Sequence, residues 1–579
     1  LRFIQEGLID LDHTLSSNSN SETFQCITVC HATMISTLQE IHDNHHRIGR
    51  LLAHEETGHW ASFMRDKAVR KWCRQQKIPM VEFNQTGVTR CLQHRDDYSK
   101  KFKAFMAKPR HATPKPEELR QRLVVLPGLS GYLSSYHLDM DIFTEIPTQH
   151  RSDRPMRQQR GGETKAMATL NSFLQERGSG FSSGISSPNS SWTSCSRLSP
   201  YLSWGHISLR HVVFVLKNRQ DQLRKMKEQG RNTGTWLRSL QAFSSRLHWR
   251  SHFIQKLESE PELEKRDLCS AYQTLRRQDG DWNEDFYQAW STGKTGFPFV
   301  DACMRCLIEH GWLNFRMRAM LVSFATYNLW LDWKRIAPHM ARVFLDYEPG
   351  IHYPQLQMQS GTTGINAMRV YSVTKQGYDQ DPEGNFIRKF VKELVRVPKQ
   401  YIHEPWKMPH SMQQECKIWI GTNLDQDLQS NGEWTEYPLP IVNEQESARV
   451  AKAKVADIRK KGETKILANE VFEKHGSRNQ RRDEMNGRKP KALSSVVEKE
   501  DPKAQKKLTS LFSIKVTNVT NTNQKQPPQT NKDKSAGMVN TTTMLGKRKI
   551  SLSESNDKDH QEESLFAPSK KRNLWSCKA

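Results

Sequence analysis

Short apolar runs alternate with amphipathic stretches in the first part of the chain. We predict strands at the apolar runs 24–30, 48–53 and 80–83, and helices at the amphipathic stretches 34–42 and 60–73. Strands and helices in this order are typical of a parallel α/β sheet. Such a sheet needs strands before residue 24, where only one helical pattern, at 1–15, is found. We therefore expect an incomplete α/β domain over residues 1–105, in a chain that starts at Leu1 as a fragment or mature form.

The pattern changes twice further along the chain. Arg, Gln, Pro and Gly accumulate over residues 106–160, which predicts an interdomain linker. Repeated 3.6-residue periodicity with many Trp and Tyr residues over 161–410 predicts a large all-α domain. From 411 to 579 we expect a basic tail, mostly disordered from about residue 445, because polar residues dominate there and aromatic residues are few.

The net charge and the cysteine spacing indicate which partners and which thiol state to expect. The 579 residues carry a formal net charge of +24, which favours a polyanionic partner such as nucleic acid, with a basic solubilising tail as the alternative. Ten cysteines at irregular spacing indicate reduced thiols. Cys303 and Cys306 lack the second ligand pair of a zinc site, so no metal is expected. No apolar run reaches the ~18 residues of a membrane span, and we expect no membrane association.

Hydroxyl side chains gather before a predicted helix start at residues 194–202. Ser196 and Ser199 flank Arg197 and Leu198 there. Hydroxyls and free backbone N–H groups at a helix N-terminus suit a phosphate or diphosphate. An ordinary helix cap uses the same residue types, so both interpretations stay open on these residues alone.

Four blocks, in order, carry a more specific signal. They are SRLSPYLSWGHIS at 196–208, WSTGKTGFPFVDACMRCLIEHGW at 290–312, NFRMR at 314–318 with LDYE at 345–348, and DPEGNFIR at 381–388. The GKTG sequence is no phosphate loop, because Gln288 stands where that motif needs a Gly. Together the blocks resemble the FAD domain of the DNA photolyase and cryptochrome family over about 160–410. A weaker match at 54–66 resembles the end of that family's antenna-binding α/β domain.

The resemblance implies FAD as the cofactor and assigns residues to it. It pairs Arg318 with Asp346 beside the flavin, where a fixed positive charge suits the anionic reduced ring. It places the diphosphate on the 194–202 segment and Glu348 where the family usually has a second Asp. It does not identify an antenna chromophore. The implied cofactor-binding residues are Phe181, Cys195, Ser196, Arg197, Leu198, Ser199, Phe243, Arg250, Phe315, Arg318, Asp346, Tyr347, Glu348 and His352.

The expected DNA-contacting positions depart from the family's pattern. Arg246 takes the place of a Glu that bonds the damaged base pair in photolyases, and a guanidinium cannot accept those hydrogen bonds. Trp249 remains either as a stacking surface for an extruded base or as a core residue. The DNA-contacting residues that the resemblance implies are Arg246, Trp249, Arg250 and Met358.

The electron-transfer positions are altered as well. Leu356 takes the place of the family's flavin-proximal Trp, while Trp333 and Trp282 match later members of its relay. His352 faces flavin N5 by resemblance, where it is either a proton-exchanging group or a hydrogen-bonded core histidine. The predicted catalytic residues are thus Trp333, Trp282 and His352. Candidate replacements for the first electron donor are Tyr353, Trp330 and Tyr327.

Short sequence motifs in the tail predict a cellular location and a protein partner. Basic clusters at 547–549 and 570–572 predict a nuclear protein, with a solvated charged tail as the alternative and an upstream organelle signal left open. The segment from Gln505 to Phe512 resembles a sliding-clamp-binding peptide. We expect a monomeric, light-driven DNA repair flavoenzyme that acts on damaged single- or double-stranded DNA. The alternative is a cryptochrome-like photoreceptor that binds FAD without repairing DNA.

Overall fold

The structure describes most of the chain up to residue 476. The computed structural model covers residues 2–16, 27, 29–30, 32–121, 135–136, 159–421 and 434–476. The basic clusters at 547–549 and 570–572, the segment from Gln505 to Phe512 and most of the expected tail lie outside the described residues. Among the helices described, none is long and apolar enough to span a bilayer.

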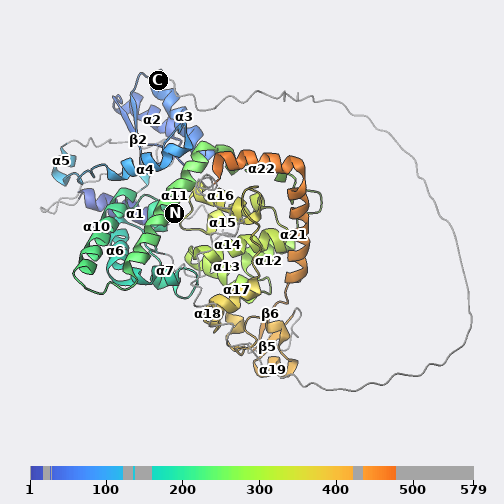
Figure 1. The fold of residues 1–579 in the computed structure, drawn as a ribbon. Coiled ribbons are helices and arrows are strands. Elements are labelled where there is room, and N and C mark those ends of the chain that lie inside the picture. The colour runs from blue at the N-terminus through green and yellow to red at the C-terminus, as the bar shows by residue number, and fades with distance from the viewer. Residues whose placement is uncertain are drawn as a thin grey trace, which may run out of the picture. The chain divides into compact units, whose positions relative to one another are not determined.

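A two-stranded parallel sheet forms the N-terminal α/β part (Figure 1). β2 (Leu51–His54) pairs with β3 (Met80–Phe83) over their full lengths. The helix α3 (Trp60–Gln75) joins the two strands, and α2 (Met34–Glu40) packs beside α3 through Leu38. The predicted parallel α/β arrangement is therefore confirmed.

The first predicted strand, at 24–30, does not join this sheet. Of that range, the described residues contain one short strand, β1 (Val29–Cys30), and it pairs antiparallel with β4 (Ser135–Tyr136). The helix predicted at 34–42 is α2 followed by a π-helical turn, η1 (Ile41–His45). Apolar patterning specified an extended segment, but non-local contacts choose the partner of a strand.

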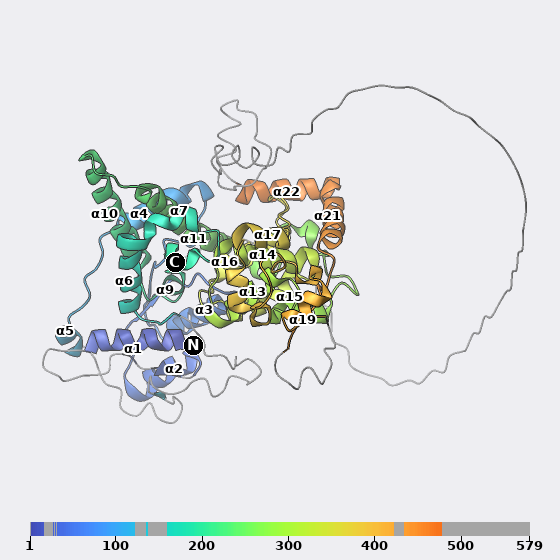
Figure 2. The ribbon, with the colours of Figure 1, turned by 90° about the horizontal axis from the view of Figure 1, so that it is seen from below.

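The described residues within 159–421 and 434–476 form a large helical domain, which includes the range 161–410 whose periodicity predicted helices (Figure 2). Its longer helices are α6 (Glu163–Ser172), α10 (Leu209–Glu228), α11 (Trp236–Ser259), α12 (Glu284–Thr292), α13 (Pro298–His310), α14 (Phe315–Ser323), α15 (Trp333–Val343), α16 (Pro349–Ser360), α17 (Val373–Gln380), α21 (Glu444–Lys460) and α22 (Gly462–His475). Short α-helices are α7 (Phe181–Gly184), α8 (Ser191–Ser194), α9 (Ser199–Ser203), α18 (Asn385–Phe390) and α19 (His410–Glu415). The 3-10 and π turns are η5 (Phe173–Arg177), η6 (Gly178–Gly180), η7 (Pro261–Glu264), η8 (Ser270–Tyr272), η9 (Phe324–Asn328), η10 (Lys392–Leu394) and η11 (Pro405–Lys407). A small parallel pair, β5 (Ile418–Ile420) with β6 (Thr435–Tyr437), completes the domain.

The boundary between the two parts differs from the prediction. α1 (Arg2–Ser16) lies inside the predicted α/β range and α4 (Tyr98–Ala107) begins inside it, yet they bury Phe3, Tyr98 and Phe102 in a core cluster of the helical domain. The predicted linker range contains α5 (Pro116–Arg120), and η2 (Arg95–Asp97) precedes α4. Amphipathic helices bury their apolar stripe against whichever surface can cover it, and their position in the sequence does not identify that surface.

The predicted disorder from about residue 445 is wrong for residues 445–476. α21 and α22 pack on the helical domain, where Ala451, Val455 and Val471 are buried in one cluster with Tyr272 and Tyr327. These three apolar residues are small and stand among many charged ones. The stripe is too weak to predict a buried face without the tyrosines that cover it.

The helix α11 connects the parts of the molecule. It packs so closely on α16 that a Cβ added to Gly350 would lie 2.5 Å from the Ile254 Cα. On the α/β side, the Gln255 side chain accepts a hydrogen bond from the Thr89 N–H (2.7 Å) and donates one to the Thr89 carbonyl (2.9 Å). Residues on α11 are thus held in a fixed position relative to both neighbours.

Candidate functional site

The 194–202 segment is a tight loop between two short helices. α8 ends at Ser194, Arg197 has a left-handed φ of 61°, and α9 begins at Ser199. The Arg177 guanidinium donates hydrogen bonds to the carbonyl oxygens of Ser196 (2.9 Å) and Cys195. Because α9 has only five residues, its N-terminus contributes little dipole. The positive charge at this loop comes from arginine side chains.

Arg197 is a partly buried cation between two aromatic rings. Its guanidinium carbon lies 3.8 Å from the ring centre of Trp312 and 4.3 Å from that of Trp192. Its Nη1 is buried without a hydrogen-bond partner among the described residues. Burial lowers the pKa of Arg197 to about 10, against the opposing attraction of Asp346. The guanidinium remains charged at neutral pH and has one donor left for a ligand.

Arg318 and Asp346 form a two-pronged ion pair. Arg318 Nη1 and Nη2 donate to the two carboxylate oxygens of Asp346 at 2.9 Å each, and Arg318 Nε donates to the Leu313 carbonyl at 2.5 Å. The Asp346 side chain is only 4% exposed, whereas that of Arg318 is 21% exposed. The pair therefore fixes a positive group that can still reach a bound molecule.

Arg250 and Glu348 form a second ion pair between α11 and the start of α16. Arg250 Nη2 donates to Glu348 Oε2 at 2.6 Å and to the Leu202 carbonyl at 3.1 Å. Burial raises the pKa of Glu348 above its usual range, while Arg250 acts in the opposite direction. This pair ties α11 to α16 and to the end of α9.

Four arginines surround the Cys195 thiol. Burial raises the pKa of Cys195 to about 11, and the positive charges of Arg197, Arg177, Arg318 and Arg246 oppose that rise. Asn314 Oδ1 and Arg316 Nε at the start of α14 are also buried without a partner among the described residues. The unused N–H donors of Arg197 and Arg316, among these positive charges, fit an anionic group such as a diphosphate or a reduced flavin. The residues present thus fit FAD.

The predicted apolar cofactor residues differ in burial, and the core cluster that contains Leu198 also packs against Cys195. Phe181, Phe243 and Leu198 are buried together in one core cluster, with the Phe181 and Phe243 ring centres 5.8 Å apart. Phe315 is 51% exposed at the start of α14. Tyr347 follows Asp346, and its hydroxyl lies 3.4 Å from His59 Nδ1 of the α/β part.

His352 is a buried, hydrogen-bonded histidine. It is 6% exposed, its Nε2 donates to the Ala337 carbonyl at 3.1 Å, and its ring contacts those of Tyr347 and Tyr353. Burial lowers the pKa of His352 to about 3. Of the two roles left open by the sequence, this geometry favours the hydrogen-bonded core histidine, because the ring is neutral near pH 7.

The two predicted relay tryptophans occupy different surroundings. Trp333 is fully buried and donates from Nε1 to Asp267 Oδ1 at 2.6 Å. Trp282 is partly exposed, with the Arg335 guanidinium 3.6 Å from its ring centre. Leu356 is buried in the main core. Tyr353 contacts His352 directly, so it is the candidate donor that lies nearest to the predicted flavin-facing position.

Three of the four predicted DNA-contacting residues lie on α11, where Arg246 and Trp249 are exposed and the Arg250 side chain is only 10% exposed. Arg246, Trp249 and Arg250 stand three and four positions apart, which places them on one side of the helix. Trp249 is 45% exposed, and its ring centre lies 5.3 Å from that of His252. Trp249 is therefore a surface aromatic and not a core residue. Met358, on α16, is partly buried.

Sequence reasoning missed several residues that build the site. They are Trp192, Arg177, Arg316 and His59. Trp192 and Arg316 lie next to or within the family blocks, but nothing in their spacing links them to Arg197 or Cys195. Only the folded chain brings them together.

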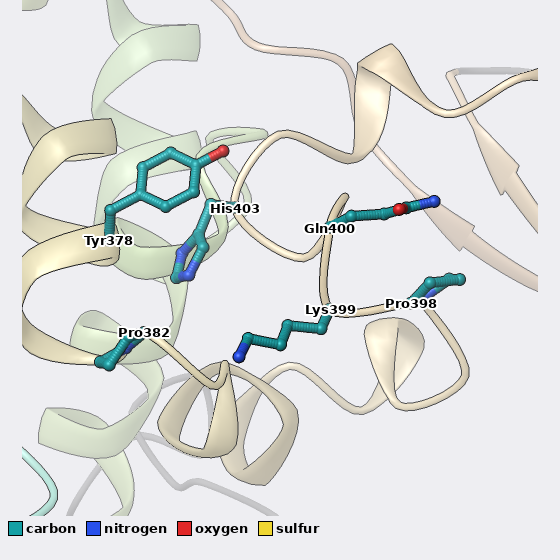
Figure 3. Close-up of a pocket in the computed structure, with 6 residues that line it drawn as sticks. All are labelled: Tyr378, Pro382, Pro398, Lys399, Gln400 and His403. Carbon is teal, nitrogen blue, oxygen red and sulfur yellow. The ribbon is translucent and has the colours of Figure 1, made fainter. Parts of the chain in front are cut away.

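A shallow hollow of about 550 Å³ lies elsewhere on the helical domain (Figure 3). The rings of Tyr378 and His403 contact each other at one side of it in a tilted arrangement, with ring centres 4.4 Å apart. Pro382, Pro398, Lys399 and Gln400 complete its lining. None of these residues belongs to the predicted site. Within the described residues no group of His, Cys, Asp and Glu is arranged to hold a metal ion.

The amino-acid sequence is similar to one protein-family model and to several known proteins. Residues 243–457 match the family model of the FAD binding domain of DNA photolyase. A deoxyribodipyrimidine photo-lyase of Alkalihalophilus pseudofirmus is 31% identical over 294 residues, covering 50% of this chain and 54% of that protein. Cryptochrome-1 of Drosophila melanogaster is 26% identical over 280 residues, covering 46% and 50%. The chain thus spans about half the length of these relatives.

Solved structures share the fold. A Synechocystis cryptochrome aligns with a TM-score of 0.61 at 20% identity, covering 78% of this chain and 87% of that one. A class III photolyase of Agrobacterium tumefaciens aligns with a TM-score of 0.55 at 21% identity, covering 79% and 88%. At these identities the likeness shows an α/β part followed by a helical domain.

Proposed function

This chain belongs to the DNA photolyase and cryptochrome family and has its FAD-binding domain, and from this we propose that it repairs DNA with light. When bound, FAD supplies light absorption and an electron for a pyrimidine lesion. The chain's own residues hold the cofactor, exclude water and receive the lesion. The DNA photo-lyase relatives support this proposal, although they match over about half of their length.

The proposed cofactor contacts come from the arginines of the candidate site. Arg318, held by Asp346, provides fixed positive charge for the anionic flavin. Arg197 has a free buried donor for the diphosphate, with Ser196 and Ser199 beside it. Burying a cation costs free energy unless an anion compensates it, so a bound cofactor also stabilises this loop.

The observation that carries the proposal is the arrangement of α11. One face of this helix holds Arg250, which is fixed to the cofactor side through Glu348, and the exposed ring of Trp249. A lesion base stacked on Trp249 would lie one helical turn or less from the cofactor contacts. Arg246 on the same face offers a cation to a DNA phosphate.

The first experiment is an absorption spectrum of the purified full chain, followed by a repair assay on thymine-dimer DNA. After chemical reduction, we expect repair under blue light and none in the dark. Trp249→Ala should keep the flavin spectrum and lower repair at limiting DNA by roughly tenfold, the value of one lost base stack. Phe83→Ala, an exposed aromatic on β3 outside the proposed DNA-contacting residues, is the matched control. Bound flavin with no repair under light would reject the proposal.

A photoreceptor without repair activity is the second candidate. Arg246 in place of a carboxylate and Leu356 in place of an oxidisable ring favour it, because both positions serve repair or flavin photoreduction in the family. It predicts that illumination changes the protease sensitivity of the chain after residue 476. Equal digestion in light and dark, together with repair, would exclude it.

A further inference from the structure

α4 and the chain after it present an unusually basic surface. Residues 98–115 hold six Lys and Arg residues and no Asp or Glu. The exposed residues of α4 are Ser99, Lys100, Lys101, Lys103, Ala104 and Ala107. We call the basic ridge the set formed by Lys100, Lys101, Lys103, Lys108, Arg110, Arg210 and Lys217.

Contacts with α10 hold two parts of the ridge together. The Arg110 guanidinium carbon lies 3.8 Å from the ring centre of Phe214, which is 43% exposed, and Arg110 Nη1 lies 2.8 Å from His211 Nδ1. Arg210 Nη2 donates to the Lys108 carbonyl at 3.0 Å. Figures 1 and 2 both show α4 beside α10. The cations of the two segments therefore form one surface.

Asp96 and Asp97 of η2 stand four positions before Lys100 and Lys101, and residues 98–115 themselves contain no carboxylate side chain. Among the described residues, no carboxylate forms an ion pair with the five cations between Lys100 and Arg110. Asp221 of α10 is paired with Arg224, further along that helix. Cations that are concentrated without ion-pair partners repel one another, and a polyanion relieves that repulsion.

The ridge lies next to the proposed DNA-contacting face. Lys103 contributes to lowering the pKa of His248 on α11, after the larger effect of burial. The ring of Tyr98 lies 5.8 Å from that of His252, and His252 lies against Trp249. A chain of ring contacts thus joins the start of α4 to the exposed Trp249.

We propose that the basic ridge binds the phosphate backbone of nucleic acid, with or without a lesion and with or without flavin. Lys and Arg side chains that neutralise phosphates release counterions, which gives sequence-independent affinity that falls with salt. Contacts of this kind position a strand and carry no base specificity. The proposal does not rest on repair activity, so a chain that failed to repair DNA would still bind nucleic acid through the basic ridge.

The test is binding of an undamaged oligonucleotide to the full chain in the dark, measured by fluorescence anisotropy across a salt series. The variant replaces Lys100, Lys103, Lys108 and Arg110 with Glu. The matched control makes the same change of charge at four exposed lysines of the α21–α22 region, Lys452, Lys460, Lys461 and Lys465. Circular dichroism and flavin absorbance check that both variants fold.

We expect the ridge variant to lose at least about tenfold in affinity near 0.15 M salt, with a salt slope smaller by roughly 3, and the control to lose much less. Equal losses in both variants would overturn the proposal, because only the net charge would then matter. An unchanged ridge variant would overturn it too and assign binding to other basic segments. Anionic vesicles bound as tightly as DNA, and lost with the ridge, would point to a membrane surface instead.

Discussion

The partly buried arginines of the candidate site are stabilised in different ways. Arg318 has the carboxylate of Asp346 and Arg250 has that of Glu348, whereas Arg197 has two tryptophan rings and an unused donor. An isolated buried charge is costly, and aromatic faces repay only part of that cost. Arg197 is therefore the residue whose surroundings most require a bound anion.

Removing the carboxylate of Asp346 should damage both stability and cofactor binding. Asp346→Asn leaves the Arg318 guanidinium without its ion-pair partner, and we expect a loss of about 3–5 kcal/mol in the free energy of unfolding together with reduced flavin occupancy. Denaturant unfolding and flavin absorbance measure the two effects. Asp379→Asn, which breaks the exposed pair with Lys375, should change stability by less than about 1 kcal/mol. Similar losses in both variants would contradict this account.

His352 gives the protein a specific acid sensitivity. Its pKa is about 3 in the folded chain and about 6.5 when unfolded. Because the folded pKa is depressed, this stability is complete above about pH 6.5 and is lost as the pH falls toward 3, by about 2 kcal/mol at pH 5. His352→Gln should reduce the drop in unfolding free energy between pH 7.5 and 5 by about that amount. His94→Gln, at an exposed site, should leave the drop unchanged.

At the scale of elements, α21 shows how a weak pattern becomes a packed helix. Asn443 caps its first turn by accepting hydrogen bonds from the backbone N–H groups of Gln445 and Glu446. Ala451 and Val455, four positions apart, then form the buried contact with the tyrosines of the domain. The cap and charged ends are readable in the sequence. The burial that stabilises the helix is not.

Substitutions at two valines of α21 distinguish the contribution of core packing to stability from that of helix propensity. Val455 is fully buried and Val450 is 39% exposed. Val455→Ala should lower the free energy of unfolding by about 2 kcal/mol, because two methyl groups are removed from a packed core. Val450→Ala should change it by less than about 0.5 kcal/mol. Chemical denaturation of both variants provides the comparison, and equal effects would mean that α21 is not docked.

At the scale of the whole molecule, α11 couples the α/β part to the helical domain. The Gln255 side chain is 4% exposed and pairs with both backbone groups of Thr89. The same helix packs against α16 at Gly350 and carries Trp249 and Arg250. Any change that loosens this helix therefore affects the link between the parts and the candidate site together.

Gln255→Ala tests that coupling. The variant leaves the Thr89 N–H and carbonyl without their partner, and we expect a loss of about 1–3 kcal/mol in unfolding free energy. Faster proteolysis of the segment around Thr89 should accompany it. Gln222→Ala, at an exposed position of α10, is the control and should change neither measurement. Unaltered stability in Gln255→Ala would show that the link does not depend on this side chain.

The sequence alone determined the alternation of strands and helices over residues 34–83 and the helical character of residues 161–410. Its resemblance to a known family indicated the pair Arg318 and Asp346. Periodicity is a local property, and family blocks preserve the residues that a cofactor needs. Prediction from the sequence failed for the folding of α21 and α22, for the strand that pairs with β1, and for the core in which α1 and α4 are buried. Each failure concerns a face or an edge whose neighbour is far away in the sequence.

The tertiary structure alone decided which cations meet. Arg177, Arg197, Arg246 and Arg318 come from separate turns and helices, and their joint influence on Cys195 exists only in the folded chain. It likewise decided that His352 is neutral, because burial sets its pKa. Charge and burial act through space, whereas the sequence records only order along the chain. The chemistry of the site was therefore fixed by packing, and the elements that pack were fixed by the sequence.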